Sequence, residues 1–80
     1  MTWFKTLLKE KNISGYQLSI LTGIPQSTIS RLSNDYIQLS NMSLENVLVI
    51  CSNINMDIYE LLQYREEYRN KYFELLNKDC

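Results

Sequence analysis

The turn sequence Gly23-Ile24-Pro25, set between two apolar repeats, is the feature that most constrains how this chain can fold. Each repeat has the three-residue spacing of one helix face. The repeats consist of Leu18 and Leu21 before the turn and of Ile29 and Leu32 after it. Glycine can take the left-handed conformation that ends a helix, and proline suits the first turn of the next helix. We therefore predict two short helices that meet at Gly23, with Ile24 packed into the corner between them.

The second of these helices, expected from Pro25 to Ser33, has a polar outer face opposite its apolar stripe. Such a face suits the DNA major groove, where glutamine can pair with adenine and arginine with guanine. The candidates for base contact are Gln26, Ser27, Thr28, Ser30 and Arg31. The alternative is an ordinary solvated helix face, in which Arg31 pairs with Asp35 instead.

A family pattern is carried by residues on both sides of the turn: Leu18, Ser19, Gly23, Ile24, Gln26, Ser27, Ile29, Ser30 and Leu32. In these residues the segment resembles the helix-turn-helix of Cro/C1-type (xenobiotic-response-element-like) repressors of phages and mobile elements. Weaker similarity through residues 43–48 and 57–62 extends the resemblance over residues 2–62. It implies an all-α fold, a five-helix Cro/C1-type domain with an extended C-terminal helix. Residues 16–19 and 21–24 are also similar to the small DNA-binding domain that opens some phage anti-CRISPR autorepressors.

The chain departs from the family pattern at three places. Gly15 stands where the family often has a polar side chain that grips a DNA phosphate. Thr22 replaces the usual apolar residue, and we expect it to loosen the packing beneath the turn. The loop over residues 33–42 lacks the family's Glu-x-Gly and its proline and is longer than usual, so its course is open.

Phosphate contacts are expected near the start of the helix that precedes the turn, because free amides at a helix N-terminus bind anions. Ser14 followed by Gln17 is a capping-box pattern that begins this helix. The residues expected to contact phosphate are Ser14, Tyr16, Gln17, Lys5, Asn34 and Tyr36. In the long loop, Gln38, Ser40 and Asn41 are further candidates. Tyr36, with Ile37 and Leu39, can equally well fix that loop to the core.

The helices outside the turn region show clear starts and apolar stripes. Thr2 can cap a first helix, Ser43 a fourth, and Asp57 with Glu60 a fifth. In the first helix the inward residues are Trp3, Phe4, Leu7 and Leu8, with Lys5 and Lys9 on the outer side. In the fourth helix the expected inner stripe is Leu44, Val47, Leu48 and Cys51, broadened by Val49 and Ile50.

The last helix is expected to run from Ile58 to Asn77, and its first turns, with Leu61 and Leu62, can close the core. We divide the chain into a helix-turn-helix domain at residues 1–63 and a continuing helix at residues 64–80. Apolar residues beyond this division have little left to cover within one chain and predict a homodimer interface. These interface residues are Tyr64, Tyr68, Tyr72, Phe73, Leu75 and Leu76. The alternative is a helix that folds back over its own domain.

The charge distribution favours the same half of the chain for binding nucleic acid. The net charge of the 80 residues is −1, which by itself does not suggest DNA. Residues 1–34 carry four cations against one anion, whereas residues 35–80 carry four cations against eight anions. The half that holds the turn is therefore the positive half, as an electrostatic footprint requires.

Several classes of function lack the residues they need. The chain has no histidine, and Cys51 and Cys80 form no CxxC pair, so no metal, cofactor or enzymatic activity is expected. No apolar run reaches the ~20 residues of a membrane span, and we expect no membrane contact and a cytoplasmic protein. The expected function is a sequence-specific repressor that binds a palindromic operator in double-stranded DNA as a homodimer. The alternative is a protein-interaction module, such as an anti-CRISPR-type inhibitor or an antitoxin, with a protein partner.

Overall fold

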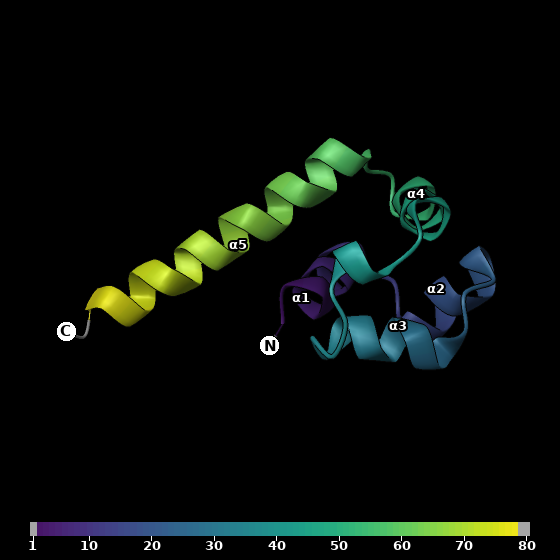
Figure 1. The fold of residues 1–80 in the computed structure, drawn as a ribbon, viewed down its shortest axis with the longest axis horizontal. Helices are drawn as coiled ribbons and strands as arrows, with labels where there is room; N and C mark the ends of the chain where they lie inside the picture. The colour runs from purple at the N-terminus through teal and green to yellow at the C-terminus, as the bar shows by residue number, and fades with distance from the viewer. Residues whose placement is uncertain (1, 79–80) are drawn as a thin grey trace.

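The structure is a computed structural model, and it describes the backbone of residues 2–78 and the side chains of residues 2–71. The fold of these residues is built from helices (Figure 1). Within this part of the chain there is no strand, and the predicted all-α class is confirmed. The elements are α1 (Trp3–Glu10), α2 (Gly15–Thr22), α3 (Gln26–Ser33), the 3₁₀ turn η1 (Leu39–Asn41), α4 (Leu44–Asn53) and α5 (Ile58–Lys78).

Reciprocal capping boxes begin α2 and α5. The Ser14 hydroxyl accepts from the Gln17 backbone N–H at 3.0 Å, and the Gln17 side-chain oxygen accepts from the Ser14 N–H at 2.9 Å. At α5, Asp57 and Glu60 exchange the same two hydrogen bonds at 2.7 and 3.1 Å. Each box satisfies amides that have no partner within their own helix. Both predicted helix starts are therefore confirmed.

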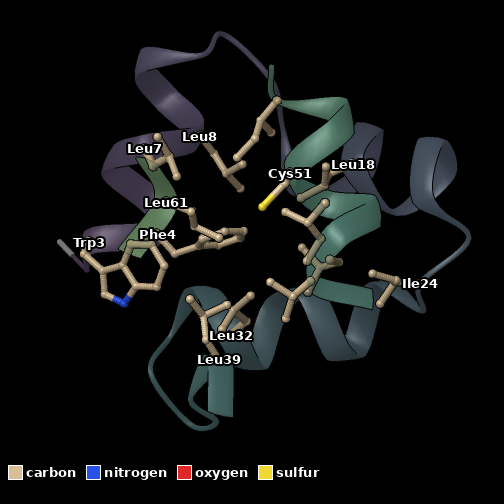
Figure 2. Packing of buried hydrophobic residues seen from close by; sticks show 14 residues of the cluster. Trp3, Phe4, Leu7, Leu8, Leu18, Ile24, Leu32, Leu39, Cys51 and Leu61 are labelled. Atoms are coloured by element: carbon tan, nitrogen blue, oxygen red, sulfur yellow. The ribbon is translucent and has the colours of Figure 1, made fainter. Parts of the chain in front are cut away.

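One hydrophobic core joins all five helices and the 3₁₀ turn (Figure 2). Its buried members are Trp3, Phe4, Leu7, Leu8, Leu18, Ile24, Ile29, Leu32, Leu39, Val47, Ile50, Cys51, Ile54 and Leu61. Phe4 and Leu61, from opposite ends of the sequence, are both fully buried, because α5 packs against α1 as well as α4. Leu61 in the first turn of α5 therefore closes the core, as predicted, whereas Leu62, which was expected to do so as well, is 39% exposed.

Three leucines expected on inner faces lie outside the core. Leu21 is 57% exposed, Leu44 65% and Leu48 46%. In α4 the buried stripe follows Ile50 and Ile54 together with Val47 and Cys51, so the helix is rotated away from the expected stripe. In α2 only Leu18 is buried, and the small residues Gly15, Ser19 and Thr22 are half-buried.

The long helix α5 packs against its own domain beyond the expected division at residue 63. Tyr64 and Tyr68 are half-buried and pack against the core, whereas Leu62 is 39% exposed. Figure 1 shows the last turns of α5 projecting beyond the other helices. The remaining expected interface residues, Tyr72, Phe73, Leu75 and Leu76, lie outside the residues whose side chains are described. The division of the chain and the homodimer interface stay predictions.

Candidate nucleic-acid interface

The turn between α2 and α3 has the predicted backbone conformation. Gly23 is left-handed, with φ 75°, and its N–H donates to the Ser19 carbonyl at 2.9 Å. Ile24 is 3% exposed and fills the corner. Pro25 immediately precedes α3, which begins at Gln26, one residue later than expected.

Two hydroxyl groups of α2 brace this turn. The Ser19 hydroxyl donates to the Ile24 carbonyl at 2.7 Å. The Thr22 hydroxyl donates to the Leu18 carbonyl at 2.7 Å and accepts from the Ile24 N–H at 3.2 Å. Thr22 thus braces the turn, because its hydroxyl satisfies a backbone amide that an apolar residue would leave unpaired. The expected loosening of the packing beneath the turn stays a prediction.

The helix α3 presents a polar face to solvent and buries its apolar face. Ile29 and Leu32 are each 1% exposed. Of the five candidates for base contact, Gln26, Ser27, Ser30 and Arg31 are exposed, whereas Thr28 is half-buried. Within residues 2–71 no ion pair holds Arg31, so the alternative pairing with Asp35 is absent from the described side chains. The roles of these residues in reading bases stay predictions.

A groove of about 450 Å³ runs between α1, the start of α2 and the outer face of α3. Its apolar wall comes from Leu8, Ile13 and Ile29, and lysines stand on the α1 side. The complete lining is Lys5, Leu8, Lys9, Ile13, Gly15, Tyr16, Gln26, Ile29, Ser30, Ser33 and Asn34. The groove thus brings three expected phosphate contacts (Lys5, Tyr16, Asn34) next to two expected base contacts (Gln26, Ser30).

The lining includes one cation that the sequence interpretation did not assign to DNA. Lys9 is exposed and lies one helical turn after Lys5, on the same side of the groove. The spacing of four residues between these lysines was the available signal, since such residues share one helix face. The basic wall of the groove is therefore a pair of ammonium groups.

Other expected contacts lie away from the groove or are already engaged. Ser14 and Gln17 do not line it, and their side chains cap α2. Asn34 lines it, but its side-chain amide donates to the Ser30 carbonyl at 2.9 Å and to the Ser30 hydroxyl at 3.3 Å. Because that hydroxyl accepts from Asn34, it keeps its own proton for an acceptor outside the helix.

The long loop is fixed to the core by only part of the expected set. Leu39 is buried and Ile37 half-buried, whereas Tyr36 is 80% exposed and does not fix the loop. The Gln38 side chain accepts from the Arg69 guanidinium of α5 at 3.1 Å. The Asn41 side chain accepts from the backbone N–H of Gln38 at 2.9 Å. Two of the further phosphate candidates therefore already hold the loop together.

The described residues show little sign of other chemistry. Burial, helped by the charge of Asp57, raises the pKa of the Cys51 thiol, which packs as a small apolar group in the core as expected. No set of three or more metal-ligating side chains comes together in the described part of the chain. Likewise, none of the described helices is long and apolar enough to cross a lipid bilayer.

Two helices joined by a tight turn, with an exposed polar face on the second, define a helix-turn-helix DNA-binding domain. The family model described as the Cro/C1-type HTH DNA-binding domain matches residues 4–67. The chain therefore belongs to the Cro/C1-type helix-turn-helix DNA-binding family. The match continues into α5, past the limit at residue 62 expected from the sequence. No curated protein and no solved structure matches the chain significantly.

Proposed function

We propose that this DNA-binding regulator is a sequence-specific transcriptional repressor that acts as a homodimer on a palindromic operator. The observation that carries the proposal is the exposed polar face of α3, of which Gln26 and Ser30 line one groove with Lys5 and Lys9. The other candidates for base contact, Ser27, Thr28 and Arg31, do not line this groove. A helix in the major groove reads base edges, while cations beside it bind phosphates and fix the register. Repression would follow when the bound dimer occludes a promoter.

The proposed base contacts divide by the chemistry of their side chains. Gln26 can make paired hydrogen bonds to adenine, and Arg31 can do the same to guanine. Ser27 and Ser30 can serve bases or phosphates. The methyl group of Thr28 can meet a thymine methyl group, although this side chain is the least exposed of the five.

The proposed phosphate contacts surround the groove. Lys5 and Lys9 supply charge from α1, and the first amides of α2 supply hydrogen-bond donors. Gly15 leaves these amides uncovered, since it has no side chain of its own. Tyr16, which lines the groove, and Tyr36, which follows the end of α3 and does not line it, are 60% and 80% exposed and offer hydroxyl groups.

A second copy would supply the affinity that one small module lacks. We place the interface on the projecting end of α5, at Tyr72, Phe73, Leu75 and Leu76, because Tyr64 and Tyr68 pack within their own chain. Two copies would present their recognition helices about one DNA turn apart, roughly 34 Å. The operator would then be palindromic, with one half-site for each copy.

The reading of DNA is tested by selecting bound duplexes from random sequences. We expect two related half-sites in the selected pool. Arg31→Ala should weaken binding to the selected duplex by about 1–3 kcal/mol and relax the preference at one base pair. Lys71→Ala removes the same charge from an exposed position on α5 and is the matched control. If Arg31→Ala keeps the base preference of the parent chain, as the control Lys71→Ala is expected to, Arg31 does not read a base.

The homodimer is tested by placing a charge in the proposed interface. Tyr72→Asp should yield monomers and reduce affinity for the selected duplex, because a buried carboxylate without a partner is costly. Tyr59→Asp puts the same charge on α5 at a side chain that is 72% exposed in a single chain. Sedimentation that shows Tyr72→Asp still dimeric, or Tyr59→Asp monomeric, would place the interface elsewhere.

A protein-interaction module is the second candidate, and an exposed apolar surface favours it. Ile20 and Leu21 of α2 are 64% and 57% exposed and line a groove of about 410 Å³ with Ile13. A protein partner could use this surface, as an anti-CRISPR-type inhibitor or an antitoxin would. Salt separates the two candidates, because phosphate contacts release counterions and binding to DNA falls steeply as salt rises. A chain that does not bind duplex DNA even in low salt would favour the protein-interaction module.

A further inference from the structure

The C-terminal end of the recognition helix α3 is held by a residue from the start of the chain. The last four carbonyls of a helix have no partner within it. The first three carbonyls of this end accept from backbone N–H groups just beyond the helix: Ser30 from Asn34 at 2.9 Å, Arg31 from Tyr36 at 2.9 Å and Leu32 from Asp35 at 3.3 Å. The fourth carbonyl, that of Ser33, accepts from the hydroxyl of Thr2, 31 positions away in the sequence.

The Thr2 hydroxyl makes two hydrogen bonds of different kinds. It accepts from the Lys5 N–H at 3.3 Å and so caps α1, and it donates its proton to the Ser33 carbonyl. One hydroxyl can do both, since it has one proton and two lone pairs. The Thr2 carbonyl in turn accepts from the Thr6 N–H at 3.1 Å and from the Thr6 hydroxyl at 2.9 Å. The backbone around the Thr2 hydroxyl is therefore fixed.

The bond joins the two walls of the groove. Ser33 is 8% exposed and lines the groove together with Lys5 of α1. At the opposite end of α3, the Ser19 hydroxyl holds the Ile24 carbonyl at 2.7 Å. The last residue of the recognition helix is thus held by the N-cap residue of α1, and the segment just before its first residue is held by a hydroxyl group of α2.

We propose that Thr2 is a positioning residue, which sets the angle and distance between the recognition helix and the lysines of α1. This inference rests on the proposed function only for its effect on DNA. Without the Thr2 bond, α3 can pivot about its braced N-terminal end. The side chains of α3 and the lysines of α1 would then no longer be held in one arrangement that contacts base edges and phosphates together. Only a fraction of the molecules would be ready to bind.

Matched variants separate positioning from simple stability. Thr2→Val keeps the shape but removes both hydrogen bonds, whereas Thr2→Ser keeps both. Ser43→Ala is the control, because the Ser43 hydroxyl caps α4 with one bond, to the Asn46 N–H at 3.2 Å. Thr2→Val and Ser43→Ala should both lower the midpoint of urea unfolding. Only Thr2→Val should weaken binding to a duplex recovered by selection, about three- to tenfold, and Thr2→Ser should restore it.

A second measurement does not depend on DNA. In the free protein, Thr2→Val should shift the Ser33 carbonyl-carbon resonance and speed amide exchange in the last turn of α3. Ser43→Ala should leave both unchanged. The proposal is overturned if Thr2→Val changes these signals and the affinity no more than Ser43→Ala does. If the parent chain binds no duplex, the proposed function fails, and the resonance alone decides whether Thr2 positions α3.

Discussion

Alanine at the chain's two glycines should change the stability in opposite directions. Gly23 ends α2 with φ 75°, and a Cβ added there would meet nothing within 4 Å. The cost of Gly23→Ala is therefore conformational and amounts to about 1–2 kcal/mol, the penalty of the left-handed region. Gly15 begins α2 without a positive φ, and its added Cβ would lie 3.4 Å from Cγ2 of Ile29, an ordinary contact. Gly15→Ala should therefore stabilise by about 0.4–1 kcal/mol, because the unfolded chain loses freedom.

Urea unfolding of the two variants and the parent chain measures both effects. For a domain of this size, 1 kcal/mol corresponds to a shift of about 4–8 °C in the melting temperature, so each change is measurable. Gly23→Asn is the control, since asparagine tolerates the left-handed conformation better than alanine and should cost less. Two shifts of the same sign, or equal costs for alanine and asparagine at position 23, would refute the reasoning.

Two further predictions concern single hydroxyl groups. Thr22→Val should lower the free energy of unfolding by about 1–3 kcal/mol in urea titrations, because it leaves the Ile24 N–H without its side-chain acceptor; an unchanged stability would contradict this. Burial, then a hydrogen bond and the nearby charge of Glu10, raise the pKa of Tyr64 from 10.0 to about 12. The folded state thus holds this proton more tightly, and its contribution to stability is complete below about pH 10 and lost as the pH rises through about 12. Unfolding measured across this range should show a smaller alkaline loss for Tyr64→Phe, and an equal loss would contradict the assignment.

The features that could be predicted from the sequence are local. The capping box of Ser14 and Gln17 and the left-handed Gly23 involve residues a few positions apart, so the chemistry of each is complete within one short segment. The same holds for α3, in which Ile29 and Leu32 share the buried face and the polar residues between them lie on the exposed face. The helix-turn-helix could be predicted because each of its signals agrees with the others.

The orientation of α4 could not be predicted in the same way. Apolar residues occupy positions 47–51 without interruption, so several stripes are equally apolar. The packing of α4 against both α2 and α5 decides between them, and it leaves Leu44 and Leu48 in solvent. Tertiary packing thus overrides a local pattern that has no single period.

Contacts between distant segments had no sequence signal at all. Thr2 reaches Ser33, and Arg69 reaches Gln38, in each case across 31 positions. Threonine and arginine are common surface residues, and nothing in the local pattern marks these two. The packing of α5 beyond residue 63 likewise depends on contacts with α1, which lies at the other end of the sequence.

The distribution of charge accounts for how an acidic chain can carry a DNA-binding surface. Figure 1 shows α3 and α5 on opposite sides of α1. The groove beside α3 holds Lys5 and Lys9, whereas exposed Glu66 and Glu67 lie on α5. Over its length α5 balances four acidic residues with four basic ones, so it is the lysine pair beside α3 that attracts a phosphate backbone, although the net charge of the chain is only −1. Two lysines can neutralise few phosphates, so in the proposed complex specific recognition would rest on the rigid placement of α3, and affinity on the proposed second copy.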